Sequence, residues 1–466
     1  MRSIIIINME FVDRKEEQRR LEALLNADKP AFVVIRGRRR IGKSALIAKV
    51  LNQDDIYYEA DRSATSNQIA SFAAVVAHHF PDFPEAIYSD WRTILVAINR
   101  WLGSKITVCL DEFPYLAESD PSLPSVIQGL LDDGKLQYNL ILCGSSQRMM
   151  YELTHDEQAP LYGRDDADFK MNPIRLPYLQ EALHLSPIET IENYAVWGGV
   201  PRYWLLRESS SGLRDAIDKH ILSNLGALYE EPLRLFRDDI KDIVKTSTIM
   251  SIVGGGSHRL SEIASRCNEP ATNLSRPLAK LVDLGYLEKE TPFGESVRDS
   301  KKNLYRIADP FLSFHFKFVS ANRSFIEIGR RAPINIMLER DLPGHFGYWW
   351  EHLCRDAVSG NYIDGVLFGE ARRWWSKDVE LDVVAESIDH KTILIGECKW
   401  TEGENGRLMT RTLERIAANL PFTAGKNVMF KLFTKVLPDE DQGNAILPEA
   451  VINAHKDESL KEYIQR

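Results

Sequence analysis

Three short apolar runs in the first third of the chain alternate with stretches of mixed polarity. They lie at residues 32–35, at residues 106–110 and within "YNLILCGSS" at residues 138–146. Continuous apolar runs of this length are typical of strands buried on both faces, and strands that alternate with helical stretches indicate a parallel sheet. We therefore predict an α/β fold with a parallel sheet whose functional site lies at the carboxyl ends of the strands.

The middle of the chain changes pattern twice. Helical periodicity runs from about residue 178 to residue 246, and two short helices separated by a turn are then expected within residues 261–284. Strand-like segments follow at residues 286–290 and 303–309, so this order predicts a helix–turn–helix with a wing. If the segment binds DNA, four residues are expected to face the major groove: Thr272, Asn273, Ser275 and Arg276.

The last third is aromatic-rich and predicts a second α/β domain. The order is a helix in "GHFGYWWEHLCRDAV", strands in "VELDVVAE" and "KTILIGECKW", a helix near residues 408–418 and a strand in "NVMFKLFTK". We divide the chain into residues 9–175, 176–245, 246–310 and 311–466. Residue 9 is included as the expected natural start, because the recognisable sequence begins directly after Met9.

Composition narrows the function classes. The chain has 466 residues and a net charge of −9, which gives it no general attraction to nucleic acid or anionic lipid. No apolar run approaches the roughly 18 residues that span a bilayer, so no membrane partner is expected. The five cysteines form no C-x-x-C pair, which argues against structural zinc or a disulfide framework and favours a cytoplasmic protein.

The loop after the first strand carries the most specific motif. Residues 37–44, "GRRRIGKS", match the pattern G-x-x-x-x-G-K-S/T between a predicted strand and a predicted helix. Such a loop surrounds phosphate oxygens with N–H groups, so ATP and Mg²⁺ are the expected ligands. The predicted nucleotide-binding residues of the loop are Gly37, Arg38, Arg39, Arg40, Ile41, Gly42, Lys43 and Ser44. Lys43 is expected at the β and γ phosphates and Ser44 at Mg²⁺, while the three arginines either attract phosphate or face solvent.

Polar residues end the next two predicted strands. Asp111 is expected to hold Mg²⁺ and Glu112 to polarise the attacking water, and Ser145 is expected to sense the γ-phosphate. The alternative interpretation of this acid pair is an acidic turn after an ordinary strand. The presence of the phosphate loop makes this alternative less favoured.

Several motifs together resemble the archaeal-type ATPases of the STAND/AAA-related class. They are "FVDRKEEQRRLEALL", the phosphate loop, "LDEFPYL", "LILCGSS", "PLYGR" and "VWGGVPRYW". The resemblance implies a P-loop ATPase core, a helical lid and a winged helix. It also implies that Phe11–Arg14 pack near the adenine and that Arg164 approaches the γ-phosphate, within its own chain or from a neighbouring copy in a homo-oligomer. A surface role for Arg164 is the alternative.

Asp382, Glu397 and Lys399 are expected to form one cluster on the two strands of the last domain. This resembles the PD-(D/E)XK nuclease fold, in which two acids and a helix acid hold divalent metal and the lysine orients or deprotonates water. The resemblance implies Asp382 and Glu397 as ligands of Mg²⁺ or Mn²⁺, with Glu351 or Glu380 in support. Solvent-facing charges at strand ends are the alternative interpretation.

Two functions from different classes follow. The first is an ATP-hydrolysing protein whose nucleotide state controls a metal-dependent nuclease-like domain acting on nucleic acid, with DNA as the expected partner. The second is a regulatory or signalling ATPase switch with a non-catalytic nuclease-like domain. Residues 246–310 carry nine Lys/Arg against eight Asp/Glu, a weak basic footprint, so the predicted winged helix either packs within the protein or contacts DNA.

Overall fold

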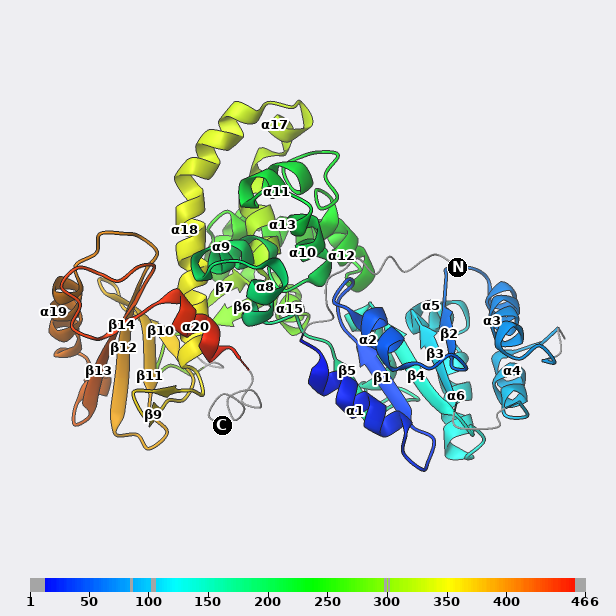
Figure 1. Ribbon diagram of the computed structural model, residues 1–466. Coiled ribbons are helices and arrows are strands. Elements are labelled where there is room, and N and C mark those ends of the chain that lie inside the picture. Colours follow the sequence, from blue (N-terminus) through cyan, green and yellow to red (C-terminus); the bar gives the residue numbers. More distant parts are fainter. Residues whose placement is uncertain (1–12, 84–86, 102–105, 297–299, 301, 457–466) are drawn as a thin grey trace. The chain divides into compact units, whose positions relative to one another are not determined.

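The computed structural model describes residues 13–83, 87–101, 106–296, 300 and 302–456 and divides the chain into two compact units (Figure 1). The first unit is Met1–Pro173 with Val200–Arg202 and Arg234–Lys241. The second unit is Ile174–Gly199, Tyr203–Leu233 and Asp242–Arg466. The predicted lid, winged helix and C-terminal segment therefore belong almost entirely to one unit, and their status as separate domains stays a prediction.

A five-stranded sheet with parallel pairing forms the centre of the first unit. Its strands are β1 Phe32–Arg36, β2 Ile56–Glu59, β3 Thr107–Asp111, β4 Asn139–Gly144 and β5 Ala167–Lys170. They are arranged in the order β2-β3-β4-β1-β5. The apolar runs therefore form adjacent buried strands, and the predicted α/β class with a parallel central sheet is confirmed.

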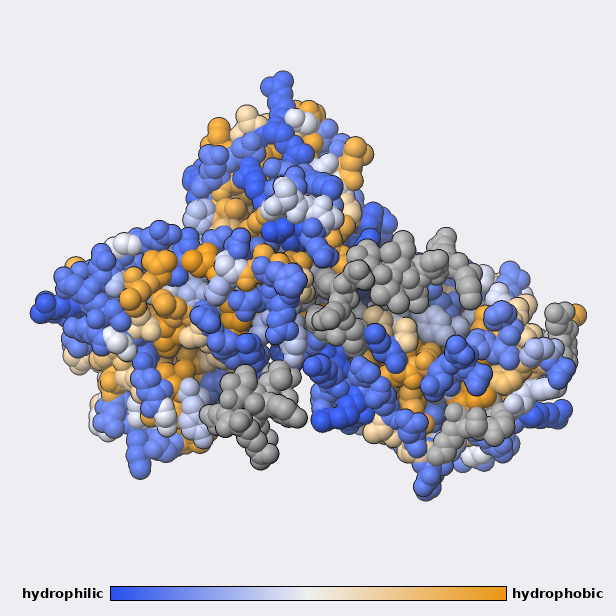
Figure 2. Space-filling view, in the orientation of Figure 1, coloured by the Kyte–Doolittle hydropathy of each residue, from blue (hydrophilic) through white to orange (hydrophobic). Residues whose placement is uncertain are grey.

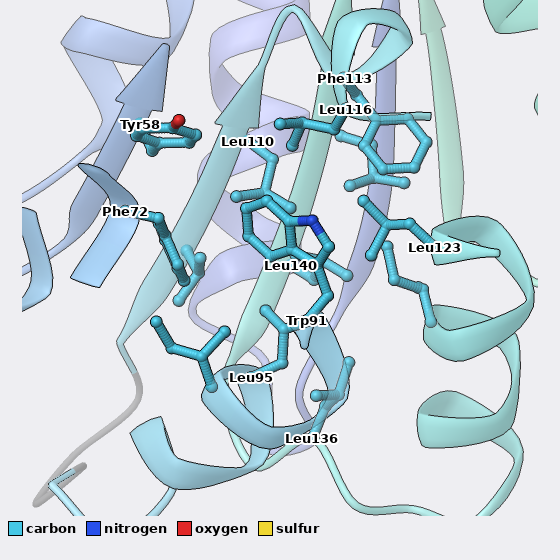
Figure 3. Close-up of a cluster of buried hydrophobic side chains, with 14 of the residues drawn as sticks. Tyr58, Phe72, Trp91, Leu95, Leu110, Phe113, Leu116, Leu123, Leu136 and Leu140 are labelled. Carbon is cyan, nitrogen blue, oxygen red and sulfur yellow. The ribbon is translucent and has the colours of Figure 1, made fainter. Parts of the chain in front are cut away.

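Helices pack against this sheet around a large apolar core. They are α1 Lys15–Leu25, α2 Lys43–Val50, α3 Thr65–His79, α4 Trp91–Ile98, α5 Phe113–Ser119, α6 Leu123–Asp132, α7 Gln147–Thr154 and most of α12 Glu231–Asp239. Trp91 lies at the centre of the cluster in Figure 3, with its ring centroid 5.5 Å from that of Phe72. Burial of these aromatic and aliphatic side chains stabilises the sheet that carries the phosphate loop.

The second unit begins with the helices predicted as a lid. They are α8 Leu176–Leu183, α9 Pro187–Trp197, most of α10 Pro201–Glu208, and α11 Leu213–His220, while α13 Ile243–Gly254 crosses the predicted boundary between residues 245 and 246. Helix α9 starts with a capping box, in which the Ser186 hydroxyl accepts the N–H of Glu189 and the Glu189 carboxylate accepts the N–H of Ser186. This cap satisfies amide groups that a helix start otherwise leaves unpaired.

Two helices and a hairpin follow at the positions predicted for the winged helix. They are α14 Leu260–Cys267, α15 Ala271–Asp283, β6 Leu287–Glu290 and β7 Leu304–Ile307, with β6 and β7 antiparallel. Next come α16 Pro310–Phe314, a π-helical turn at His315–Val319 and α17 Arg323–Glu327. The predicted helices and strands are present at these positions, whereas the winged-helix assignment and a DNA-binding role stay predictions.

A second five-stranded sheet, the C-terminal sheet, has the order β10-β11-β12-β13-β14. Its strands are β10 Arg372–Trp375, β11 Glu380–Glu386, β12 Thr392–Lys399, β13 Asn427–Thr434 and β14 Ala445–Ile446, and a small hairpin pairs β8 Tyr362–Ile363 with β9 Val366–Leu367. The helices are α18 Arg331–Val358, α19 Gly406–Ala417 and α20 Pro448–Ala454. The predicted order of helix, strands, helix and strand is confirmed.

The face of the molecule shown in Figure 2 is mostly polar. On the face shown in Figure 2, hydrophilic residues cover much of each unit and hydrophobic residues are scattered between them. Among the helices that the structure describes, none combines the length and apolar character needed to cross a membrane.

Gly396 lies in the middle of the C-terminal sheet, and its replacement tests how tightly this sheet is packed. A Cβ atom there would lie 2.8 Å from the Phe433 ring and 3.0 Å from the Val383 Cβ atom. We expect Gly396→Ala to lower the free energy of unfolding by about 1–3 kcal/mol through overpacking. Thermal unfolding followed by circular dichroism would measure this loss.

Gly344→Ala is the matched control, because Gly344 lies exposed in α18 and an added Cβ atom meets no atom within 4 Å. Alanine favours helix over glycine by up to about 1 kcal/mol, so this variant should be as stable as the wild type or more stable. Equal stability of Gly396→Ala and the wild type would show that the sheet has room at this position.

Candidate functional site

The phosphate loop follows β1, and close packing explains why its first residue is glycine. A Cβ atom at Gly37 would lie 2.7 Å from the carbonyl oxygen of Met171, too close unless one of the two segments moved. At the other end, Gly42 has a φ of 101°, a left-handed conformation that glycine adopts without strain. Helix α2 begins at the next residue, so the loop leads directly into a helix amino end, where phosphate groups bind favourably.

Lys43 points its ammonium group back into the loop. This buried group donates hydrogen bonds to the carbonyl oxygens of Gly37 at 2.8 Å and Arg38 at 3.2 Å. A phosphate oxygen would offer the ammonium a charged acceptor, which makes a stronger hydrogen bond than a neutral carbonyl. The three loop arginines differ, since Arg38 is buried, Arg39 is exposed and Arg40 is half-buried.

Asp111 is buried at the end of β3, beside the loop. Its Oδ2 atom accepts hydrogen bonds from the Ser44 hydroxyl at 3.0 Å and from the Tyr57 hydroxyl, and its Oδ1 atom accepts the N–H of Glu112 at 2.9 Å. Burial and the charge of Asp111 raise the pKa of Tyr57, which keeps this hydroxyl a donor. The two predicted Mg²⁺ ligands, Ser44 and Asp111, are therefore hydrogen-bonded neighbours.

Glu112 is held by Ser145 from the neighbouring strand end. The Glu112 Oε2 atom accepts the Ser145 hydroxyl at 2.9 Å and the Ser145 N–H at 3.2 Å. Glu112 also has a φ of 54°, and a non-glycine residue in this region costs about 1–3 kcal/mol. The predicted water-polarising acid and the predicted γ-phosphate sensor thus bind each other.

The end of α12 returns to this site from far along the chain. The Ser146 hydroxyl donates to the carbonyl oxygen of Asp238 at 2.7 Å, and the N–H of Arg148 donates to Asp239 at 3.4 Å. Arg39 of the phosphate loop lies 4.0 Å from the Asp238 carboxylate. Burial raises the pKa of Asp238, and the charge of Arg39 opposes that rise.

Arg14 is the last residue of the segment that is predicted to pack near the adenine. Its buried guanidinium donates to the carbonyl oxygens of Asn172 at 2.5 Å and Ile41 at 3.4 Å. It therefore joins the start of the first unit to the phosphate loop and to the segment after β5. The first two residues of Phe11–Arg14 lie outside the described residues, and an adenine contact stays a prediction.

Arg164 does not reach the phosphate loop of its own chain. Its guanidinium forms a two-point pair with Asp132, with Nε–Oδ1 at 2.9 Å and Nη2–Oδ2 at 3.1 Å. Two residues later, Asp166 accepts the N–H of Phe32 at the start of β1. Arg164 thus lies near the amino edge of the sheet, whereas the loop leaves the carboxyl edge. In this arrangement Arg164 does not approach the predicted γ-phosphate position of its own chain. Its approach to the γ-phosphate of a neighbouring copy stays a prediction.

A second candidate site lies on β11 and β12 of the C-terminal sheet. The ladder between these strands ends just before Asp382 and Glu397, which are the next residues outward. The Lys399 ammonium lies 2.7 Å from Glu397 Oε1, and Asp382 Oδ2 accepts the N–H of Cys398 at 2.9 Å. Adjacent strands therefore bring the three predicted residues into one neighbourhood.

The acids of this neighbourhood influence one another. Burial, and then the charge of Asp382, raise the pKa of Glu351 to about 7 and also raise the pKa of Glu397. Burial alone would lower the pKa of Lys399, but its hydrogen bond with Glu397 and the charge of Glu397 raise it. Asp382 is thus the shared neighbour of both glutamates.

Two arginines supply counter-charge beside Glu351. Arg355 Nη1 and Arg373 Nε each lie 4.0 Å from Glu351 Oε2, and Arg355 also donates to the carbonyl oxygen of Asp382 at 3.2 Å. Glu380, the other predicted supporting acid, forms an ion pair with Arg373. Glu351 is therefore the supporting acid whose pKa responds to Asp382.

Two small sets of oxygen donors are available to a divalent cation. In the part of the chain that the structure describes, no three His, Cys, Asp or Glu side chains are arranged to hold a metal ion. Mg²⁺ is commonly held by one or two carboxylates together with waters and substrate phosphates. Asp382 with Glu397, and Asp111 with Ser44, supply oxygen donors that fit this smaller set.

His352 of α18 contacts the β6–β7 hairpin near the second candidate site. It lies 3.3 Å from Glu288 of β6 and 3.2 Å from Asp356. Burial alone would lower the pKa of His352, but the two carboxylates raise it to about 10. A protonated imidazole therefore bridges two acids.

Comparison with known proteins adds two family matches. Residues 11–203 match a family described as an ATPase domain predominantly from Archaea. Residues 315–415 match a family described as archaeal and bacterial proteins of unknown function. An uncharacterized protein of Methanocaldococcus jannaschii is 30% identical over 399 residues, which are 84% of this chain and 88% of that protein.

Solved structures are similar over much of the chain. The Walker-type ATPase of Pyrococcus abyssi has 20% identity and a TM-score of 0.49, covering 66% of this chain and 95% of that one. The ORC2 protein of Aeropyrum pernix has 15% identity and a TM-score of 0.46, covering 69% of this chain and 96% of that one.

The His352 bridge predicts a pH dependence of stability. Because the folded pKa lies above the ordinary value of 6.5, the folded protein binds more protons than the unfolded chain between about pH 6.5 and about pH 10. The stability contributed by His352 should be complete below that window and lost as pH rises through it. His352→Gln should flatten this part of the profile, measured as urea unfolding against pH.

His390→Gln is the matched control, because the side chain of His390 is 77% exposed. Other groups also titrate at high pH, so the informative quantity is the difference in slope between each variant and the wild type. Equal slopes for the wild type and His352→Gln would show that the imidazole does not bridge the two acids.

Proposed function

The chain belongs to the archaeal-type ATPase family, and from this premise we propose that it binds and hydrolyses ATP in its first unit and thereby controls a metal-dependent nuclease-like site in its second unit. The observation that carries the proposal is the hydrogen-bonded set at the carboxyl edge of β1, β3 and β4. Ser44 binds Asp111 and Ser145 binds Glu112, so the loop and both strand ends form one site.

Each residue of this site has a role in ATP hydrolysis. Lys43 exchanges its loop carbonyls for the β and γ phosphates, and Ser44 with Asp111 holds Mg²⁺. When bound, Mg²⁺ offsets the charge of the phosphates. Glu112 orients and deprotonates the attacking water once it leaves Ser145, whose hydroxyl then donates to the γ-phosphate.

The second site would act on the phosphodiester backbone of nucleic acid, with DNA as the expected substrate. Asp382 and Glu397 hold a divalent cation, Glu351 supports them, and Lys399 orients or deprotonates water. A bound cation offsets the charge of the reacting phosphate. Additional contacts are available on α15, where Thr272, Asn273, Ser275 and Arg276 are all exposed.

A regulatory ATPase switch with a non-catalytic C-terminal domain is the second candidate. It is favoured by the two arginines that already balance Glu351. Cation-dependent cleavage by the purified protein separates the two candidates. Cytoplasmic location and assembly into a homo-oligomer remain predictions under both.

Two substitutions test the nucleotide site. Lys43→Ala should weaken ATP binding about 10- to 100-fold, because a charge-assisted contact of about 1.5–3 kcal/mol is lost. Glu112→Gln should bind ATP normally yet lower kcat by about 10²–10⁴, because only water activation is removed. Binding of a fluorescent ATP analogue and phosphate release would measure the two effects.

Exposed residues of the same helices provide controls. Lys49→Ala lies later in α2 and Glu118→Gln lies in α5, and both variants should bind and hydrolyse ATP like the wild type. If Lys43→Ala retains wild-type affinity and turnover, ATP does not bind at this loop.

Asp382→Asn and Glu397→Gln test the second site. Each should abolish Mg²⁺- or Mn²⁺-dependent cleavage, and each should leave the metal-free protein as stable as before or more stable, because one of the neighbouring like charges is removed. Lys399→Ala should retain cation binding but lose rate. Gel assays on single- and double-stranded DNA and on RNA, with and without ATP, would measure cleavage.

Asp378→Asn is the control, because Asp378 is an exposed acid in the turn between β10 and β11. It should cleave like the wild type. Cleavage that persists in Asp382→Asn would remove this site from the reaction, and no cleavage by the wild type under any condition would favour the regulatory switch.

A further inference from the structure

A charged cavity of about 280 Å³ lies within the second unit, between the β6–β7 hairpin, α18 and β10. Four lining residues are arginine or lysine and four are acidic: Lys289, Arg355, Arg372, Arg373, Glu288, Glu290, Asp356 and Glu370. The proposed cleavage reaction uses none of these eight side chains.

Most of the acids have a local partner. Glu370 pairs with Arg372 at 2.6 Å, and His352 bridges the two acids from β6 and α18 described above. Glu290 is different, because three guanidinium groups converge on its single carboxylate. Arg373 lies 3.2 Å from it, Arg306 lies 3.3 Å from it and Arg355 lies 3.8 Å from it.

A break in strand pairing accompanies the position of Arg373. The register shifts between the pairs Arg372–Val384 and Trp374–Leu381, so β11 carries an extra residue and Arg373 of β10 lies opposite both Asp382 and Val383, as at a β-bulge. Bulges commonly re-aim a side chain beside a functional site. The side chain of Arg373 is only 11% exposed, and its Nε atom has no hydrogen-bond partner among the described residues.

Arg355 and Arg373, two of the three arginines beside Glu290, also lie beside the candidate cleavage site. Arg355 and Arg373 each contact Glu290 on one side and lie 4.0 Å from Glu351 on the other. Arg355 also donates to the backbone of Asp382. A ligand held between these guanidinium groups would therefore lie next to the acids that are proposed to hold the cation.

We propose that Arg355 and Arg373 form a binding site for a backbone phosphate of a nucleic-acid strand, and that Glu290 of the hairpin occupies this site in place of the phosphate. The inference rests on the proposed function for the identity of the ligand. It adds a substrate-binding subsite and an autoinhibitory contact that the cleavage chemistry alone does not require.

The chemistry of the contact matches a phosphodiester. A carboxylate and a phosphodiester each carry one negative charge and present two oxygens, and guanidinium groups bind both with paired hydrogen bonds. A strand also needs local positive charge here, because the whole chain has a net charge of −9 and the neighbouring acids repel phosphate. Arg355 and Arg373 supply that charge beside the acids.

Removal of the Glu290 charge tests the proposal directly. Full-length protein in EDTA, which prevents cleavage, is titrated into a labelled single-stranded oligonucleotide. Glu290→Gln should bind about 10-fold more tightly than the wild type, since the arginines gain a charge-assisted phosphate contact. The dependence of log affinity on log salt should become steeper by about 0.7, as one more phosphate of the single strand is neutralised.

Glu295→Gln is the matched control, because Glu295 lies in the loop of the same hairpin and pairs with Lys302 at 2.7 Å rather than with the cavity arginines. It removes the same charge and should bind like the wild type. Glu290→Gln combined with Arg373→Gln should lose the gain in affinity. An equal gain in Glu290→Gln and Glu295→Gln would overturn the proposal, because total charge would then explain it.

Free phosphate is the competing ligand of the same chemistry. If Glu290→Gln gains affinity for inorganic pyrophosphate but not for the oligonucleotide, the nucleic-acid assignment is wrong. If Glu290→Gln does not fold, Glu290→Asp is the alternative variant. It moves the carboxylate away from the arginines without removing its charge, so it should give a smaller gain in oligonucleotide affinity. No gain in a folded Glu290 variant overturns the proposal.

These binding measurements separate the inference from the cleavage reaction. A gain in oligonucleotide binding together with no cleavage by the wild type would support the phosphate site in a non-catalytic domain. Cleavage that depends on Asp382, with no effect of Glu290, would support the nuclease and reject the autoinhibitory contact.

Discussion

The hydrogen-bonded order of β1, β4 and β3 is the constraint on which the nucleotide site depends. Because these strands are parallel, their carboxyl ends meet at one edge, where the phosphate loop, Asp111 and Ser145 lie side by side. A slip of one residue in β3 would turn Asp111 to the other face and break its contact with Ser44. The second site depends in the same way on the register of β11 with β12, since Asp382 and Glu397 follow the last pair of that ladder.

The buried carboxylates of the two candidate sites have different neighbours. Asp111 is held by neutral donors, namely two hydroxyl groups and an N–H, which leave its negative charge available to a cation. Glu351 and Glu397 instead lie beside guanidinium and ammonium groups. A divalent cation can therefore join the first site with little competition, whereas at the second site it must compete with charges of the chain itself.

Local motifs made much of the architecture predictable. The phosphate loop, the acid pair after β3 and the strands of the C-terminal sheet each depend on residues close together in sequence, and the elements were found where expected. Tyr57, Asp238 and Arg373 were not predicted as site neighbours, because each reaches its contact through tertiary packing. Tyr57 depends on the pairing of β2 with β3, Asp238 on the return of α12, and Arg373 on the register shift between β10 and β11, which no residue pattern predicts. The pair between Arg164 and Asp132 was missed for the same reason.

The C-terminal sheet does not stand alone within its unit, and this limits how it can work. Glu192 of α9 accepts the Trp400 indole N–H at 3.4 Å and lies 3.9 Å from the Lys435 ammonium, and Trp400 directly follows Lys399. Burial raises the pKa of Glu192, because it disfavours the charged carboxylate. The contact therefore places a buried acid beside Trp400, at the edge of the candidate site. Glu290 makes a comparable contact from the hairpin. Motion of α9 would change the charge beside Trp400 and Lys435, and motion of the hairpin would change the charge beside Arg355 and Arg373. Under the proposed function, breaking these two glutamate contacts would be a way to control the second site without refolding of the sheet.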